Sequence, residues 1–104
     1  MFATIRRYSV SGDTKTEMFR IIEKDYLDKV TEISGFDGYF VVDNGETEVA
    51  AIALFETREG ADESTRLAAD TVRNHADTLR LEPPRVTAGN VVFHRESSRL
   101  LAAH

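Results

Sequence analysis

Residues 39–56 read YFVVDNGETEVAAIALFE, and this stretch decides the fold. Its two apolar runs favour two β-strands. Between them, Asn44-Gly45 is the strongest short signal for a hairpin, because both central residues of a type I′ turn need a positive φ. We therefore predict paired strands over 36–43 and 47–56. The loop length sets their register, and a loop longer than two residues would shift the pairing.

On each side of the hairpin the sequence predicts one helix and one further strand. Thr14 and Glu17 have the spacing of a capping box, in which each side chain accepts from a free backbone N–H at the start of a helix. Apolar residues then recur every three or four positions and predict a helix of about 18 residues that ends at Ser34-Gly35. Thr57 can cap the second helix. The remaining elements are expected as a strand over 2–8, a helix over 58–79 and a strand over 86–95.

The order strand, helix, strand, strand, helix, strand is that of the split βαβ, or ferredoxin-like, fold. We therefore predict an α+β protein with a four-stranded antiparallel sheet and both helices on one of its faces. A chain of 104 residues has the length of one domain. We place this domain at 1–96 and a C-terminal tail, which lacks turn residues and a clear hydrophobic period, at 97–104.

The predicted third strand is apolar at every position over 49–55, so both faces of the sheet are apolar there. Two helices cover only one face of such a sheet, and an open face in water should alternate apolar and polar residues. Because large exposed apolar patches usually mark interfaces, we predict a homodimer that pairs through this sheet face. Asn90 and His94, which the period of two places on one strand face, are candidates for interface hydrogen bonds, and a place in a ligand pocket is the alternative. The alternative is a monomer with an unusually apolar outer face.

The composition excludes several classes of function. Thirteen Lys and Arg against eighteen Asp and Glu give a net charge of −5, which argues against a nucleic-acid partner. The chain has no cysteine, and its three histidines lack the short spacing of metal ligands, so we expect no disulfide and no metal site. No apolar run approaches the roughly 18 residues that cross a bilayer, so we expect a cytoplasmic protein without membrane contact.

Five short segments carry a resemblance to a known family. They are the first strand, GFDGY at 35–39, the Asn44-Gly45 hairpin, FETREGA at 55–61 and VTAGNV at 86–91. Together they resemble the dimeric α/β-barrel superfamily, which includes the antibiotic-biosynthesis monooxygenases, and in particular its small bacterial members. The resemblance implies that two sheets pair into a dimeric α/β barrel, with a pocket between the sheet and the helices of each subunit.

The superfamily includes cofactor-independent oxygenases of aromatic polyketides, haem-degrading enzymes and non-catalytic ligand-binding domains. The resemblance therefore implies a monooxygenase-like enzyme that acts, with no cofactor, on a small aromatic or polyketide-like molecule. The alternative is a non-catalytic small-ligand-binding or structural dimer. The haem-degrading members rely on an Asn, a Trp and a His, whereas this chain has no Trp and its first strand has no Asn. Haem degradation is therefore not expected.

His75 is the candidate catalytic residue. It follows Val72 by three positions and precedes Leu79 by four, so helical spacing turns it toward the apolar stripe of the second helix. A neutral imidazole there could act as a general base, bind a metal or hydrogen-bond a bound phenol. The alternative is a partly buried histidine that is held by a backbone or side-chain partner.

Phe19, Tyr26 and Val72 are candidates for the lining of a ligand pocket. They lie on the apolar stripes of the two helices, where the alternative role is simple core packing. Tyr26 is the better of the two aromatic candidates, because its hydroxyl needs a partner if the ring is buried. Arg6 and Arg7 point to opposite faces of the first strand. Pairing at the surface or interface is the favoured role for them, and contact with an acidic ligand is the alternative.

Overall fold

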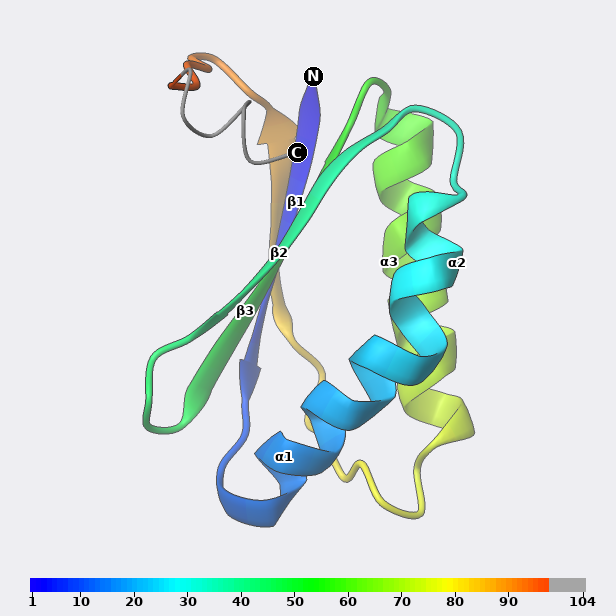
Figure 1. Cartoon of the computed structure of the whole chain (residues 1–104), viewed down its shortest axis with the longest axis vertical. Coiled ribbons are helices and arrows are strands. Elements are labelled where there is room, and N and C mark those ends of the chain that lie inside the picture. The colour runs from blue at the N-terminus through cyan, green and yellow to red at the C-terminus, as the bar shows by residue number, and fades with distance from the viewer. Residues whose placement is uncertain (98–104) are drawn as a thin grey trace.

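One antiparallel sheet carries the fold, and the helices pack against one of its faces (Figure 1). The computed structural model describes residues 1–97. Its elements are β1 (Phe2–Ser9), α1 (Gly12–Ile21), the π-helical turn η1 (Ile22–Tyr26), α2 (Leu27–Thr31), β2 (Phe36–Asp43), β3 (Glu48–Phe55), α3 (Arg58–Asn74) and β4 (Arg85–Asn90). The strand order β2-β3-β1-β4 confirms the ferredoxin-like α+β fold.

The first predicted helix is continuous from α1 through η1 to α2, with a widened turn in its middle. It begins at Gly12, so Thr14 lies inside the first turn and the predicted capping box is wrong. Ser11 occupies the N-cap position and its side chain makes no capping hydrogen bond. The π turn inserts one extra residue into the helical path, and such turns are frequent at functional sites. It ends at Tyr26, which is buried against the sheet.

The hairpin is present, but its loop runs over 44–47 and is longer than two residues. Phe40 therefore lies opposite Ile52, the shifted pairing that a longer loop was expected to produce. Gly45 has a φ of +82°, and the Asn44 side chain accepts from the backbone N–H groups of Glu46 and Glu48. Hydrogen bonds to the Asn44 side chain thus help to close the loop. A type I′ turn would need a positive φ at Asn44, but no non-glycine residue among those described has one, so the turn is not of this type.

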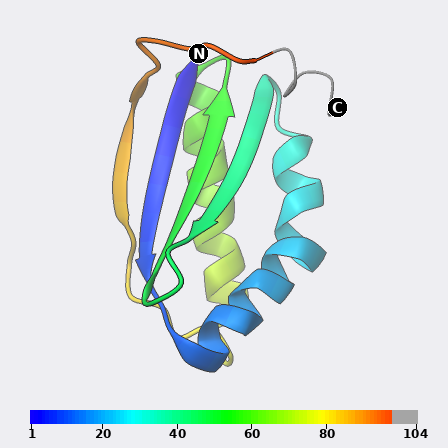
Figure 2. The same cartoon turned by 60° about the vertical axis from the view of Figure 1, so that its left-hand side comes forward.

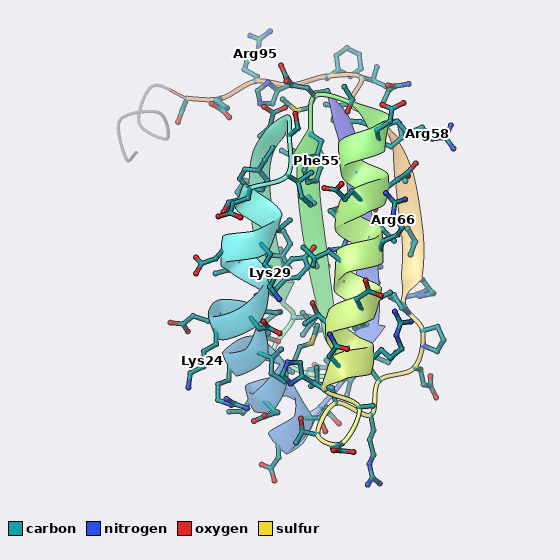
Figure 3. The ribbon with its side chains drawn as sticks, turned by 90° about the vertical axis from the view of Figure 1, so that its right-hand side faces the viewer. Lys24, Lys29, Phe55, Arg58, Arg66 and Arg95 are labelled. Carbon is teal, nitrogen blue, oxygen red and sulfur yellow. The ribbon has the colours of Figure 1, made fainter. Side chains whose placement is uncertain are left out.

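The alternation along β1 and β3 separates a buried face of the sheet from an open one. Val49, Ala51, Ala53 and Phe55 of β3 are buried beneath the helices. Arg6 of β1 lies opposite Ala51 and shares this buried face. Figure 3 looks onto the helix layer, where α2 and α3 run side by side over the sheet with Phe55 between them. Figure 2 shows the opposite face of the sheet, which the helices leave open.

The second helix is shorter than its apolar spacing predicts. Thr57 caps α3 as expected, because its hydroxyl accepts from the Gly60 backbone N–H at 3.3 Å. The helix ends at Asn74, and His75 is its C-cap residue with φ −115° and ψ 27°. The following turn is closed by the His75 carbonyl, which accepts from the Leu79 backbone N–H at 2.7 Å. Leu79 is buried although it lies beyond the helix, so the spacing of apolar residues continues across the turn. The predicted helix end at residue 79 is therefore wrong.

The last strand ends at Asn90 and not at residue 95, because its partner strand runs out. Asn90 lies opposite Phe2, the first residue of β1, and Val91 then makes one further backbone hydrogen bond, to Met1. Phe93 beyond it is 92% exposed. The predicted tail at 97–104 lies outside the described residues, apart from Ser97. No helix within 1–97 is long and apolar enough to cross a membrane.

Candidate functional site

A charged side chain lies in the core between the sheet and the helices. The alternation of β1 turns Arg6 inward, together with Thr4 and Tyr8, and leaves it 1% exposed. Its Nη2 group donates to the Tyr26 hydroxyl at 3.1 Å, while its buried Nε and Nη1 atoms make no hydrogen bond within residues 1–97. Arginine is almost never fully buried unless it is paired, and buried polar atoms are nearly always hydrogen-bonded. This guanidinium therefore marks the candidate site.

Tyr26 connects the guanidinium to both helical segments. Its hydroxyl accepts from Arg6 and donates to the Ser64 backbone carbonyl of α3 at 3.1 Å. Its ring also meets that of Tyr39 on β2, with the ring centroids 5.4 Å apart and the planes tilted by 50°. The π turn η1 places Tyr26 at this point, so one phenol joins β1, α3 and β2 around Arg6.

The electrostatics of the site are those of one cation among neutral phenols. Burial is the strongest influence on the pKa of Arg6 and acts to lower it, but the surrounding Tyr26, Tyr8 and Tyr39 together raise that pKa above its usual value. Burial raises the pKa of Tyr26 and of Tyr39, and the positive charge of Arg6 opposes the rise only in part. Arg6 is therefore charged and both phenols are protonated at neutral pH.

Two hollows with shared lining residues lie beside Arg6. A narrow cavity of about 30 Å³ separates the sheet from the helices, and an adjoining hollow of about 350 Å³ shares Arg6 and Tyr8 with it. The narrow part takes only a group of a few atoms, whereas the larger one lies within the size range of ligand pockets. Further lining residues of the narrow cavity are Tyr26, Tyr39, Met18, Ile21, Ile22, Ala51, Ala68, Thr71, Val72, Leu79 and Leu81. The larger hollow is completed by Thr65, Ala68, Ala69, Val72, Leu81, Glu82, Pro83, Pro84 and Val86.

The structure brings two of the three predicted pocket residues to this site. Tyr26 and Val72 line the narrow cavity. Phe19 does not, and it lines a separate shallow hollow together with Val41 of β2. Phe19 packs against the edge of the core there and is half-buried.

His75 lies at the end of α3 and is not among the lining residues of either hollow. Its Nε2 atom is 3.0 Å from the Asp25 carboxylate of η1. Hydrogen bonds from His75 and from Lys29 hold the pKa of Asp25 below its usual value. The pair thus fastens the end of α3 to η1, and the catalytic role of His75 stays a prediction.

The two candidates for interface hydrogen bonds do not share a strand face, because β4 ends at Asn90. Asn90 is exposed at the end of the strand, and the Nε2 atom of His94 beyond it lies 3.3 Å from the Glu96 carboxylate. Their role in a dimer stays a prediction. Within residues 1–97, no group of three or more His, Asp or Glu side chains is arranged to hold a metal ion.

From the sequence alone, contact with an acidic ligand is only the alternative role of Arg6, and no pattern indicates that Tyr8 and Tyr39 belong to the site. The period of two does place Arg6 and Tyr8 on one face of β1. The opposite face of β1 carries the apolar residue Ile5, which is at least as suited to the core. The alternation alone therefore does not show which face of the strand the helices cover. Only the packing of the helices turns Arg6 into a buried cation.

Known structures share this fold. The NE2512 protein of unknown function from Nitrosomonas europaea is 16% identical, with a TM-score of 0.73 over 93% of this chain and 94% of that one. The monooxygenase from the gene ActVA-Orf6 of Streptomyces coelicolor, solved in complex with nanaomycin D, is 16% identical, with a TM-score of 0.70 over 93% and 92%. An MhuD variant with two manganese protoporphyrin IX molecules per active site is 15% identical, with a TM-score of 0.73 over 93% and 100%.

No family model matches the sequence, and no curated protein matches it either. The structural similarity extends over nearly the whole chain, and it includes a named monooxygenase with bound nanaomycin D. The chain therefore has the fold of the antibiotic-biosynthesis-monooxygenase-like proteins, as the sequence resemblance predicted. At these identities the similarity concerns the fold, and a shared fold does not define a shared reaction.

Proposed function

We propose that this chain forms a homodimeric, monooxygenase-like protein that binds a small aromatic molecule between its sheet and helices. The observation that carries the proposal is the hollow of about 350 Å³ beside Arg6, with apolar walls and buried N–H donors that no other side chain uses. A mostly apolar pocket with a few directed polar groups is the usual form of a small-molecule site. The expected cytoplasmic location stays a prediction from composition.

The proposed reaction is a cofactor-independent oxygenation. A base removes the proton of a phenolic substrate, and the resulting anion has carbanion character at a ring carbon. This carbon adds to O₂ to form a peroxide, and loss of water leaves a carbonyl, so one oxygen atom enters the product and the other enters water. The positive charge of Arg6 would stabilise the anionic oxygen of the substrate. His75 is the proton acceptor predicted from the sequence.

One observation favours the non-catalytic alternative. His75 is bonded to Asp25 and lies outside the lining of both hollows, so the residues next to Arg6 include no histidine. Glu82 is the carboxylate in the lining of the larger hollow, and it is exposed. A binding protein needs the cation and the pocket but no base. Ligand binding without oxygen uptake would therefore support this alternative.

The open sheet face supports the homodimer. It carries the side chains that alternate with the buried ones, and Phe40 and Val42 at its β2 edge are each 51% exposed. Ile5, Ile52 and Leu54 extend the apolar surface across the sheet. Water exposure of this surface is costly, and a second copy of the same face would cover it. Sedimentation equilibrium at micromolar concentration should show twice the chain mass, and a species of 11.7 kDa would contradict the proposal.

The ligand and reaction are tested on the purified chain without added metal or cofactor. Native mass spectrometry first checks for a co-purified small molecule. Oxygen uptake is then measured with polycyclic phenols and anthrones, in the presence of a chelator, for the natural chain and for Arg6→Met. The proposal predicts uptake that depends on the protein and falls in the variant. Absence of both binding and uptake across these compounds would contradict it.

A further inference from the structure

We infer that the ligand is an aromatic carboxylate, and that its carboxylate group pairs with Arg6. The inference rests on the proposed binding of a small molecule between the sheet and the helices, and it narrows the chemical class of that molecule. It starts from a missing counter-charge. Arg6 is 1% exposed, yet none of the ion pairs formed within residues 1–97 includes it.

The groups around Arg6 do not neutralise it. Tyr26 accepts one hydrogen bond, and burial keeps both Tyr26 and Tyr39 protonated at neutral pH. The carboxylate of Glu82 belongs to the exposed part of the lining of the larger hollow. A buried cation without a partner is costly, whereas one whose partner arrives with a ligand gives the ligand a strong and specific anchor. The counter-charge is therefore expected on the ligand.

The hydrogen-bonding capacity also indicates a carboxylate. A guanidinium has five N–H donors, one of them on Nε and two on each Nη atom. The buried Nε and Nη1 groups make no hydrogen bond within the described chain, so at least three donors are free. A carboxylate offers two oxygens with about four lone-pair positions and matches the planar fork of arginine. A neutral ketone or amide offers one oxygen and no charge.

The dimensions of the two hollows place the two ends of such a ligand. The narrow cavity of about 30 Å³ beside Arg6 has room for a group of carboxylate size but not for a ring. The adjoining hollow of about 350 Å³ is lined by Val72, Pro84 and Val86, which form apolar walls for one or two fused rings. The acid group would thus enter first and the ring would close the hollow behind it.

The experiment compares 2-naphthoate with 2-naphthamide, its uncharged counterpart of the same shape. Binding to the natural chain, to Arg6→Met and to Arg7→Met is measured by titration calorimetry at pH 7. Arg7 is the matched control, because it is the next residue of β1 and faces the opposite side of the sheet. Circular dichroism and sedimentation of each variant show that the fold and the assembly are retained.

The inference predicts that the natural chain and Arg7→Met bind the naphthoate at least about tenfold more tightly than the naphthamide. Arg6→Met should lose this preference, with naphthoate affinity reduced by about tenfold or more. Equal binding of the two compounds to the natural chain would overturn the carboxylate inference and leave the proposed pocket intact. Binding of neither compound would count against the pocket itself, and therefore against both proposals.

Discussion

The pair of Arg6 and Tyr26 gives a quantitative prediction about stability. Arg6→Met removes a buried cation whose Nε and Nη1 groups are unpaired, and it leaves an unbranched apolar side chain beside a cavity whose lining is mostly apolar and aromatic. An unsatisfied buried polar group costs about 1–3 kcal/mol, and apolar replacement of buried charge is often stabilising by about 1–4 kcal/mol. We expect Arg6→Met, without ligand, to raise the free energy of unfolding by about 1–3 kcal/mol.

Tyr26→Phe should have the opposite effect, and its size should depend on Arg6. In the natural chain it removes the hydroxyl that accepts from Arg6 and donates to Ser64, so the buried cation loses its hydrogen bond to Tyr26, at a cost of about 1–3 kcal/mol. In the Arg6→Met background only the bond to Ser64 is lost, and the expected cost falls to about 0.5–1 kcal/mol. The two substitutions should therefore be coupled by about 1 kcal/mol or more.

The assay is urea unfolding of the four chains of this double-mutant cycle, followed by circular dichroism at one fixed protein concentration. The concentration is fixed because association would add to the apparent stability. Arg7→Met serves as the control for exchanging arginine for methionine within β1. The reasoning is refuted if Arg6→Met destabilises the protein while Arg7→Met does not. It is also refuted if Tyr26→Phe costs the same in both backgrounds.

Three further predictions concern other parts of the molecule. His75→Ala should move the pKa of Asp25 up toward its usual value in an NMR titration. The lowered pKa of Asp25 stabilises the fold at pH values above its usual pKa and this stabilisation is lost on acidification, so it should be smaller in the variant. Unchanged oxygen uptake would remove His75 from the catalytic proposal. Phe40→Glu puts a charge on the open sheet face and should shift sedimentation toward the monomer, whereas an unchanged dimer would place the interface elsewhere. Gly60→Ala should destabilise by about 1–3 kcal/mol in thermal unfolding, against the usual gain for alanine in a helix, because the new Cβ would lie 2.8 Å from the Phe55 ring.

Local patterns were sufficient for the order of the elements. The Asn44-Gly45 hairpin, the Thr57 cap and the spacing of apolar residues each involve residues a few positions apart. The structure contains the hairpin, the capped helix and the strands in the predicted order along the chain. Local patterns were weaker at the element ends. The end of β4 depends on where β1 begins, at Phe2, and no pattern within residues 86–95 contains that information.

The sequence by itself determined the ferredoxin-like topology, the apolar character of both sheet faces and the opposite directions of Arg6 and Arg7. Only the tertiary structure decided that Arg6 lies on the buried face, that a π turn brings Tyr26 to it, and that His75 pairs with Asp25 outside the hollows. The physical reason is the distance along the chain. Periodicity describes one face of one element, whereas the site is made by contacts between residues 20 and 38 positions apart. Such contacts form only once the helices have packed on the sheet. The same packing buries the Arg6 guanidinium and leaves its Nε and Nη1 atoms unpaired.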